Sequence, residues 1–194
     1  IQEQSHIDAL VERAQYHGLS THMDGARLMN AAVAQNLPPA RLVQSIDTVS
    51  VCLSKGLGAP LGSVLVGSQV IIERARRLRK MLGGGMRQAG IIAAAGRFAL
   101  QHNLDRLAQD HRRTQELASA LEGIKGLHFD RSRVQTNMLF LQSVQMPALA
   151  DHLALQGIAL TVTGHNTRVV LHMDIDDEAL KQIIASIQGF FNAH

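Results

Sequence analysis

A run of apolar and β-branched residues enters a glycine-rich loop in the stretch IDTVSVCLSKGLG, residues 46–58. Valine and isoleucine at this density favour a strand, and the glycines that follow end it. We therefore predict a buried strand over residues 46–53. Lys55 leaves this strand at its carboxyl end, where a charged side chain is disfavoured unless its amine has a use.

A second predicted strand, over residues 19–23, comes earlier in the chain and runs into Asp24-Gly25. Helical patterns over residues 26–34 and 38–44 separate the two strands, and the second of them opens with two prolines. A strand, a helical crossover and a strand form a right-handed parallel unit, so both strands end at the same edge of the sheet. Because ligands of open α/β sheets bind at that edge, we expect Asp24 and Lys55 to face one crevice.

The flanking segments extend this α/β pattern in both directions. A helix over residues 5–17 ends at Gly18, and a strand over 61–66 follows a loop of about seven residues, too short for a parallel crossover, so it should run antiparallel. A basic amphipathic helix over 70–81 stops at three glycines, residues 83–85. A long helical pattern then runs from 87 to 122, with a bend expected near His102.

Strands and helices alternate again in the last third of the chain. We predict strands over 137–141, 158–162 and 167–173, and helices over 147–156 and 176–191. The boundary between a large domain, residues 1–100, and a small C-terminal domain, residues 101–194, is placed inside the long helix.

The composition is that of an ordinary globular protein, with 46% hydrophobic and 18% charged residues. Cys52 is the single cysteine, which excludes an intrachain disulfide framework and suits a reducing, cytoplasmic compartment. No apolar run is long enough to span a membrane. The net charge of +3 is concentrated in residues 74–80, but aromatic residues make up only 3% of the chain, which argues against a nucleic-acid partner.

Three residues near the predicted sheet edge have side chains suited to one kind of chemistry. The amine of Lys55 is suited to a Schiff base with an aldehyde cofactor, and the alternative is a surface lysine in a loop. The carboxylate of Asp24 is suited to keeping the ring nitrogen of pyridoxal phosphate protonated, and the alternative is a cap on the following helix. Arg27 is suited to binding a carboxylate at two points, with a simple ion pair as the alternative.

Other motifs carry weaker signals. His22 with Asp24, and His172 with Asp174, are spaced like metal-ligand pairs, but neither pair has a nearby third ligand, so no metal site is predicted. The glycines at 83–85 with Arg87 suit either an anion-binding turn or a structural hinge. Arg168 lies in an otherwise apolar strand and is expected to meet a carboxylate, either of a ligand or of an internal salt bridge.

Several ordered motifs resemble those of one known family, the low-specificity L-threonine aldolases, which are fold-type I pyridoxal phosphate enzymes. They are HMDGARLMN (22–30), CLSKGLGAPLGS (52–63), RKMLGGGMRQ (79–88), QTNM (135–138) and RVVLH (168–172). The resemblance covers essentially the whole chain. It implies an α/β fold of the pyridoxal phosphate-dependent transferase type, with part of the large-domain sheet followed by a small C-terminal α/β domain.

The resemblance also implies a reaction and assigns roles to residues. The reaction is reversible cleavage of threonine, allo-threonine or a related β-hydroxy-α-amino acid to glycine and an aldehyde. Lys55 would form the Schiff base and Asp24 would pair with the pyridinium, while Arg27 and Arg168 would hold the substrate carboxylate. Lys80 and Arg87 look like the pair that reaches the cofactor phosphate of a neighbouring subunit in a homotetramer.

One departure from the family concerns what precedes residue 1. In the family that part supplies a phosphate-binding loop, a group that stacks on the cofactor ring, and a histidine that acts on the β-hydroxyl. We expect this chain to be an incomplete form that is inactive by itself. The alternatives are another lyase or aminotransferase on the same scaffold, and a non-catalytic truncated subunit.

Overall fold

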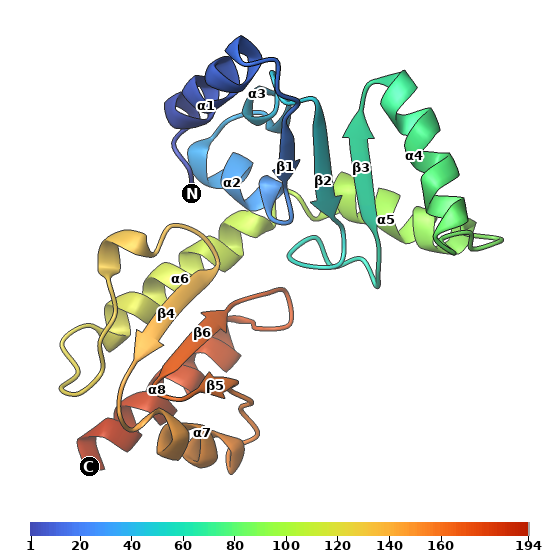
Figure 1. Cartoon of the computed structure of the whole chain (residues 1–194). Coiled ribbons are helices and arrows are strands. Elements are labelled where there is room, and N and C mark those ends of the chain that lie inside the picture. The colour runs from blue at the N-terminus through green and yellow to red at the C-terminus, as the bar shows by residue number, and fades with distance from the viewer. Residues whose placement is uncertain (194) are drawn as a thin grey trace. The chain divides into compact units, whose positions relative to one another are not determined.

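A computed structural model describes residues 1–193 and divides the chain into two compact units, Ile1–Leu107 and Ala108–His194 (Figure 1). Each unit is α/β and has its own three-stranded sheet. The boundary expected at residue 100 falls inside helix α5 (Gly90–His102).

The first unit contains the predicted strand–helix–strand crossover. Its elements are α1 (Gln4–Tyr16), β1 (His22–Asp24), α2 (Leu28–Gln35), α3 (Pro39–Leu42), β2 (Thr48–Cys52), β3 (Ser63–Gly67), α4 (Gln69–Met81) and α5. Strands β1 and β2 are parallel, and β2 and β3 are antiparallel, in the order β1-β2-β3. Both predicted strand directions are therefore confirmed, although β1 begins later than expected.

The two faces of this sheet differ because side chains alternate along a strand. Val49 and Val51 of β2 are buried in a cluster with Leu28 and Ala32 of α2 and with Leu42 of α3. The intervening residues of β2 are half-exposed and share their face with His22 and Asp24. The polar ends of β1 and β2 thus lie beside a packed apolar layer that holds the strands in register.

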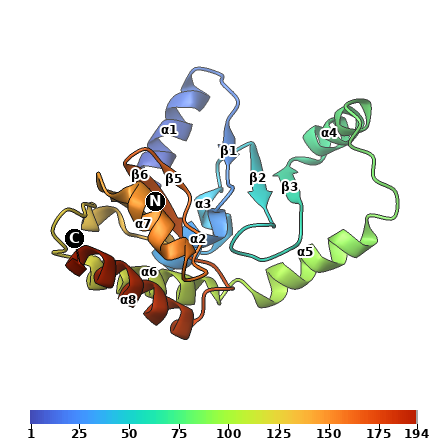
Figure 2. The same cartoon turned by 90° about the horizontal axis from the view of Figure 1, so that it is seen from below.

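Strand β3 and helix α4 form the exposed side of the first unit. Figures 1 and 2 both place α4 beyond β3, on the side away from β1. Every residue of β3 is exposed, and none of α4 is buried. The basic amphipathic helix predicted over 70–81 is confirmed, but its apolar residues do not contribute to a core of this unit.

The long helical pattern is not one helix. It forms α5 and α6 (Leu107–Leu121), with a short non-helical joint between them that starts at Asn103, the C-cap of α5. The expected bend near His102 is therefore a complete break. Leu107, which is fully buried, packs the start of α6 into a second small cluster with Leu53, Leu57, Ala59 and Ala99.

The second unit has one continuous core. Its sheet is antiparallel, in the order β4 (Met138–Gln142), β6 (Asn166–Val170), β5 (Val162–Thr163), and it packs with α6, α7 (Met146–Ala154) and α8 (Asp177–Ala193). A short 3-10 helix, Arg131–Arg133, precedes β4. The strand predicted over 158–162 was mostly wrong, because pairing with β6 begins only at Val162.

No helix within residues 1–193 is both long enough and apolar enough to cross a membrane.

Candidate active site

The carboxyl ends of β1 and β2 lie side by side in the first unit. The parallel register pairs His22 with Thr48 and Asp24 with Ser50, so β1 ends at Asp24, opposite a residue two positions before the end of β2 at Cys52. Lys55 follows Cys52 by three residues. The expectation that the two strands end at one edge of the sheet is confirmed, and that Asp24 and Lys55 face one crevice stays a prediction.

Asp24 is exposed at the end of β1. One oxygen, Oδ1, accepts a hydrogen bond from the backbone N–H of Ala26 at 3.1 Å, and Oδ2 accepts none from residues 1–193. Asp24 does not cap the next helix, because α2 starts at Leu28 with Arg27 as its N-cap residue. The free oxygen is therefore available to a ligand.

Gly25 fixes the direction in which the chain leaves β1. A Cβ atom at this position would lie 2.8 Å from the backbone oxygen of Ser50 and 3.0 Å from a methyl carbon of Val49. Only glycine allows the backbone to approach β2 this closely. The residue after Asp24 is thus dictated by packing against the neighbouring strand.

Lys55 sits at the exposed start of a tightly bonded loop. Its amine makes no hydrogen bond or ion pair with another residue of the described chain, 1–193. The loop closes through three backbone hydrogen bonds, from Leu53 to Gly62 O, from Ala59 to Leu53 O, and from Gly58 to Lys55 O. The lysine side chain is therefore free while the backbone that carries it is fixed.

Arg27 and Lys55 line one small depression at this edge. Asn30, Cys52 and Gly56 complete part of its wall. Asn30 is 4% exposed, and its side-chain oxygen would lie 3.4 Å from a Cβ at Gly56. We did not predict a role for Asn30 from the sequence, although an asparagine in the apolar run of α2 was the available signal.

The two histidine–aspartate pairs do not form metal sites within residues 1–193, where no group of three potential ligand side chains gathers. His22 Nδ1 lies 2.9 Å from Thr48 Oγ1, across the parallel pair. His172 Nδ1 lies 3.4 Å from the carboxylate of Asp174, and both side chains are exposed. The contact of His22 is thus with Thr48, and only His172 and Asp174 contact each other as a pair.

The glycine turn after α4 does not offer free amides. Gly83 donates to Lys80 O, Gly84 donates to Arg79 O, and Gly85 donates to Gly83 O. Because these three donors are already used, the structure argues against the interpretation of the glycines as an anion-binding turn. A Cβ at Gly85 would lie 2.7 Å from Lys80 Nζ, so the turn folds against the lysine side chain.

Lys80 and Arg87 are both exposed, on the last turn of α4 and just beyond the glycine turn. Neither makes an ion pair or a side-chain hydrogen bond with another described residue. Two cations without a carboxylate partner are suited to an anionic group from outside this chain.

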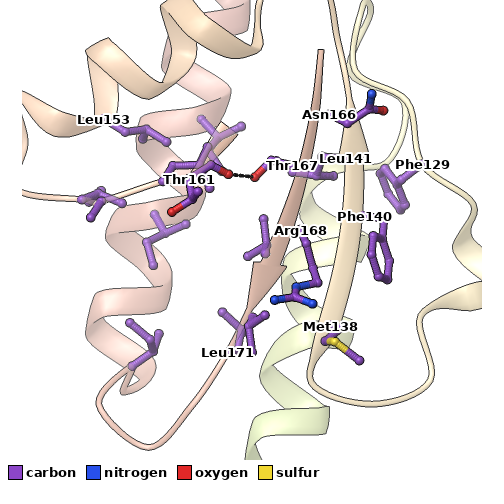
Figure 3. Close-up of a pocket in the computed structure, with 18 of the residues that line it drawn as sticks. Phe129, Met138, Phe140, Leu141, Leu153, Thr161, Asn166, Thr167, Arg168 and Leu171 are labelled. Carbon is purple, nitrogen blue, oxygen red and sulfur yellow. Dashed lines mark hydrogen bonds between the residues drawn. The ribbon is translucent and has the colours of Figure 1, made fainter. Parts of the chain in front are cut away.

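Arg168 belongs to the second unit, on the exposed face of β6. It is paired across the sheet with Phe140, which is 55% exposed, and Figure 3 shows both beside Met138. These residues line an open hollow of about 1300 Å³, where Thr167 Oγ1 also donates to Thr161 O at 2.6 Å. The part of the chain from 1 to 193 provides no ion pair for Arg168, so the internal salt bridge is not formed.

The chain is similar to proteins named as low-specificity threonine aldolases. It is 41% identical over 97% of its length to "Probable low-specificity L-threonine aldolase 2" of Arabidopsis thaliana, and 41% identical over 89% to "Low specificity L-threonine aldolase" of Escherichia coli O157:H7. It covers 55% and 51% of these two proteins, so the chain spans about half the length of the curated relatives it matches.

A solved structure gives the fold. A putative L-allo-threonine aldolase from Listeria monocytogenes superposes with a TM-score of 0.84 at 16% identity, over 97% of this chain and 57% of that one. The chain has the α/β fold of the fold-type I pyridoxal phosphate-dependent enzymes, as expected from its motifs. The family model described as "Beta-eliminating lyase" matches residues 1–144, and the chain therefore belongs to the beta-eliminating lyase family.

Proposed function

We propose that the protein containing this chain is a pyridoxal phosphate-dependent carbon–carbon lyase. Its reaction is cleavage of L-threonine, L-allo-threonine and related β-hydroxy-α-amino acids to glycine and an aldehyde. The observation that carries the proposal is the placement of two side chains at the ends of adjacent parallel strands, the free amine of Lys55 and the carboxylate of Asp24 with its free Oδ2. The relatives named as threonine aldolases support the substrate class.

The side chains at this edge fit pyridoxal phosphate, the cofactor on which members of this family depend. A primary amine suits its aldehyde, and a carboxylate suits its ring nitrogen. When bound, the cofactor supplies a protonated ring that accepts the electron pair of a breaking Cα–Cβ bond.

Lys55 and Asp24 have distinct tasks in this scheme. Lys55 would hold the cofactor through its amine, which becomes free again when the amine of the substrate takes its place. Asp24 would keep a proton on the ring nitrogen through its free Oδ2, because a charge-assisted hydrogen bond favours the charged ring. Gly25 keeps this carboxylate at the strand end by its close packing against β2.

The arginines are assigned to anionic groups. Arg27 lines the same depression as Lys55, and its planar guanidinium can bind a substrate carboxylate at two points. Arg168 is assigned to that same carboxylate, and Lys80 with Arg87 to the cofactor phosphate of a neighbouring subunit. The absence of an ion pair for Lys80, Arg87 and Arg168 within residues 1–193 supports these assignments.

The assembly we propose is a homotetramer in the cytoplasm, without nucleic-acid or membrane partners. Exposed apolar side chains on β3 and α4, such as Val66 at 51% and Val70 at 78%, support a covered surface there. The single cysteine suits a reducing compartment.

Chemical trapping tests the site directly. The protein is incubated with pyridoxal phosphate and reduced with borohydride, and the modified lysine is identified by peptide mass spectrometry. We expect the label on Lys55, its loss in Lys55→Ala, and its retention in Lys125→Ala, which removes an exposed lysine of the second unit. A label on other lysines, or none at all, contradicts the proposal.

The second candidate reaction is β-elimination, and the description of the family as a beta-eliminating lyase favours it. Product analysis with threonine separates the two reactions. Glycine with acetaldehyde supports the aldolase, whereas a keto acid with ammonia supports elimination.

A further inference from the structure

The joint between α5 and α6 bonds to the loop that carries Lys55. Asn103 Nδ2 donates to Leu57 O at 2.8 Å, and Arg106 Nη2 donates to Gly56 O at 3.2 Å. Both hydrogen bonds are partly buried, and they join residues 46 and 50 positions apart. Hydrogen bonds between residues so far apart in sequence form only in the folded chain. They fix the position of the loop relative to the joint.

The hydrogen bonds account for three successive carbonyls after β2. Lys55 O accepts from Gly58 N at 2.8 Å, Gly56 O accepts from Arg106, and Leu57 O accepts from Asn103. The carbonyls of a loop have no neighbouring strand to supply hydrogen-bond donors. A carbonyl that loses its donor in the protein interior costs more free energy than one that loses it at the surface, where water replaces the donor. Each of the residues 55, 56 and 57 thus has its backbone carbonyl held by a hydrogen bond.

Side-chain packing also restrains the backbone of this loop. A Cβ at Gly56 would lie 2.8 Å from Cδ2 of Leu107, and Leu107 itself is fully buried. Leu57 is 3% exposed and belongs to the same apolar cluster. The loop therefore rests directly on Leu107, and a side chain at position 56 would have to displace the buried Leu107 side chain.

We propose that Asn103 and Arg106 are positioning residues for Lys55, acting as a clamp on the two residues that follow it. The clamp is defined as the hydrogen bonds Asn103–Leu57 and Arg106–Gly56. This inference rests on the function proposed above for Lys55. The lysine amine is carried on a flexible four-carbon side chain, so it takes up its reactive position reliably only when the backbone of Lys55 is held in place. Small displacements of a reacting group lower the reaction rate strongly.

Four variants test the clamp in the whole protein. Asn103→Leu and Arg106→Met remove the donors at similar volume, and Arg106→Lys keeps a cationic donor. Arg97→Met is the matched control, because Arg97 is an exposed arginine on α5 without a bond to the loop. Circular dichroism confirms that each variant is folded, and Arg106→Lys keeps the test decisive if Arg106→Met does not fold.

The first readout is hydrogen exchange at the amides of Gly58 and Ala59, which donate within the loop. We expect exchange to quicken about tenfold in Asn103→Leu and Arg106→Met, as for the loss of one hydrogen bond. Arg106→Lys should restore most of the protection, and Arg97→Met should leave it unchanged.

The second readout is the borohydride trapping rate on Lys55, together with the pH dependence of the visible absorbance of the cofactor-bound protein. We expect trapping to slow about tenfold, and the pH of the absorbance change to shift, only in the two donor-less variants. A role confined to stability would not shift that pH.

The outcomes separate the clamp from the proposed function. If Lys55 of the unsubstituted protein traps cofactor normally, unchanged exchange or unchanged trapping in the donor-less variants overturns the clamp alone. If Lys55 of the unsubstituted protein traps no cofactor, the proposed function is overturned, and the positioning role with it.

Discussion

The two units of the chain bury apolar side chains in different ways. In the second unit, the buried residues of the sheet and of α6, α7 and α8 form one continuous cluster. In the first unit the core consists of two smaller clusters, one beside β2 and one beneath the Lys55 loop. All of β3 and α4 lies outside both clusters.

The two units therefore contribute differently, the second mainly to stability and the first to the proposed chemistry. Core area stabilises a unit roughly in proportion to the apolar surface removed from water, so the second unit has the stronger internal basis for folding. The first unit holds the free amine and carboxylate, and its close packing is concentrated at the strand ends that carry them. Substitutions in the two units should therefore differ in size and in kind.

The largest expected effect is from Leu139→Ala in the second unit. Leu139 is fully buried in the single core, so its truncation should lower the free energy of unfolding by about 3 kcal/mol. Urea unfolding followed by hydrogen exchange would show the loss at amides of residues 108–193.

The matched control is Leu155→Ala, because Leu155 is 90% exposed. Its effect should stay within about 0.5 kcal/mol. An equal loss of protection at amides of the first unit in Leu139→Ala would mean that the two units unfold together, and the comparison would fail.

A smaller effect is expected from Gly25→Ala in the first unit. The new methyl group would meet the backbone oxygen of Ser50 at 2.8 Å, and backbone cannot move aside as a side chain does, so a loss of about 2 kcal/mol is expected. Gly90→Ala is the control, because a Cβ at Gly90 would meet no described atom within 4 Å other than those of its chain neighbours and its own helix backbone. Thermal unfolding measures both, and equal melting temperatures would show that β1 and β2 are not closely packed at Asp24.

Local patterns predicted the part of the fold that presents Asp24 and Lys55. The β-branched run of β2 and the helical crossover before it determined the parallel pairing, and a short loop determined that β3 runs antiparallel. Strand β5 was mispredicted because the residues before Val162 have strand composition but no partner in the sheet. Strand propensity reflects pairing as much as residue type.

The support of the Lys55 loop was beyond sequence reasoning. Asn103 and Arg106 lie in what reads as one continuous helix, and their bonds to residues 57 and 56 depend on where that helix breaks. Polar residues at a break are a signal only after the break is known. The anion-binding interpretation of the glycine turn was likewise decided by hydrogen bonds, which a glycine count cannot reveal.

A still smaller effect is expected from Asp177→Asn in the second unit. Asp177 Oδ1 accepts from Arg113 Nε and Arg112 Nη2, each at 2.7 Å, and joins α6 to α8. The bond from Arg113, then that from Arg112, lowers the pKa of Asp177. Asp177→Asn should lower the melting temperature by less than Leu139→Ala does but by more than Glu178→Gln, which breaks a pair with both side chains mostly exposed. A reversed order would show that the Asp177 link does not stabilise the helix pair.

The smallest effect concerns pH and the pair Asp8–Arg41 in the first unit. Arg41 donates to both oxygens of Asp8, at 3.1 and 2.6 Å, and this bonding lowers the pKa of Asp8 from 3.8 to about 2. The folded chain therefore releases this proton more readily than the unfolded chain, so the pair stabilises fully above pH 3.8, and this contribution is lost as the pH falls to about 2. The difference in unfolding free energy between the unsubstituted protein and Asp8→Asn should shrink across that interval. Arg41→Met should reproduce the change, and the double variant should add nothing. A difference that stays constant from pH 5 to pH 2 would show that the pair is not formed in solution.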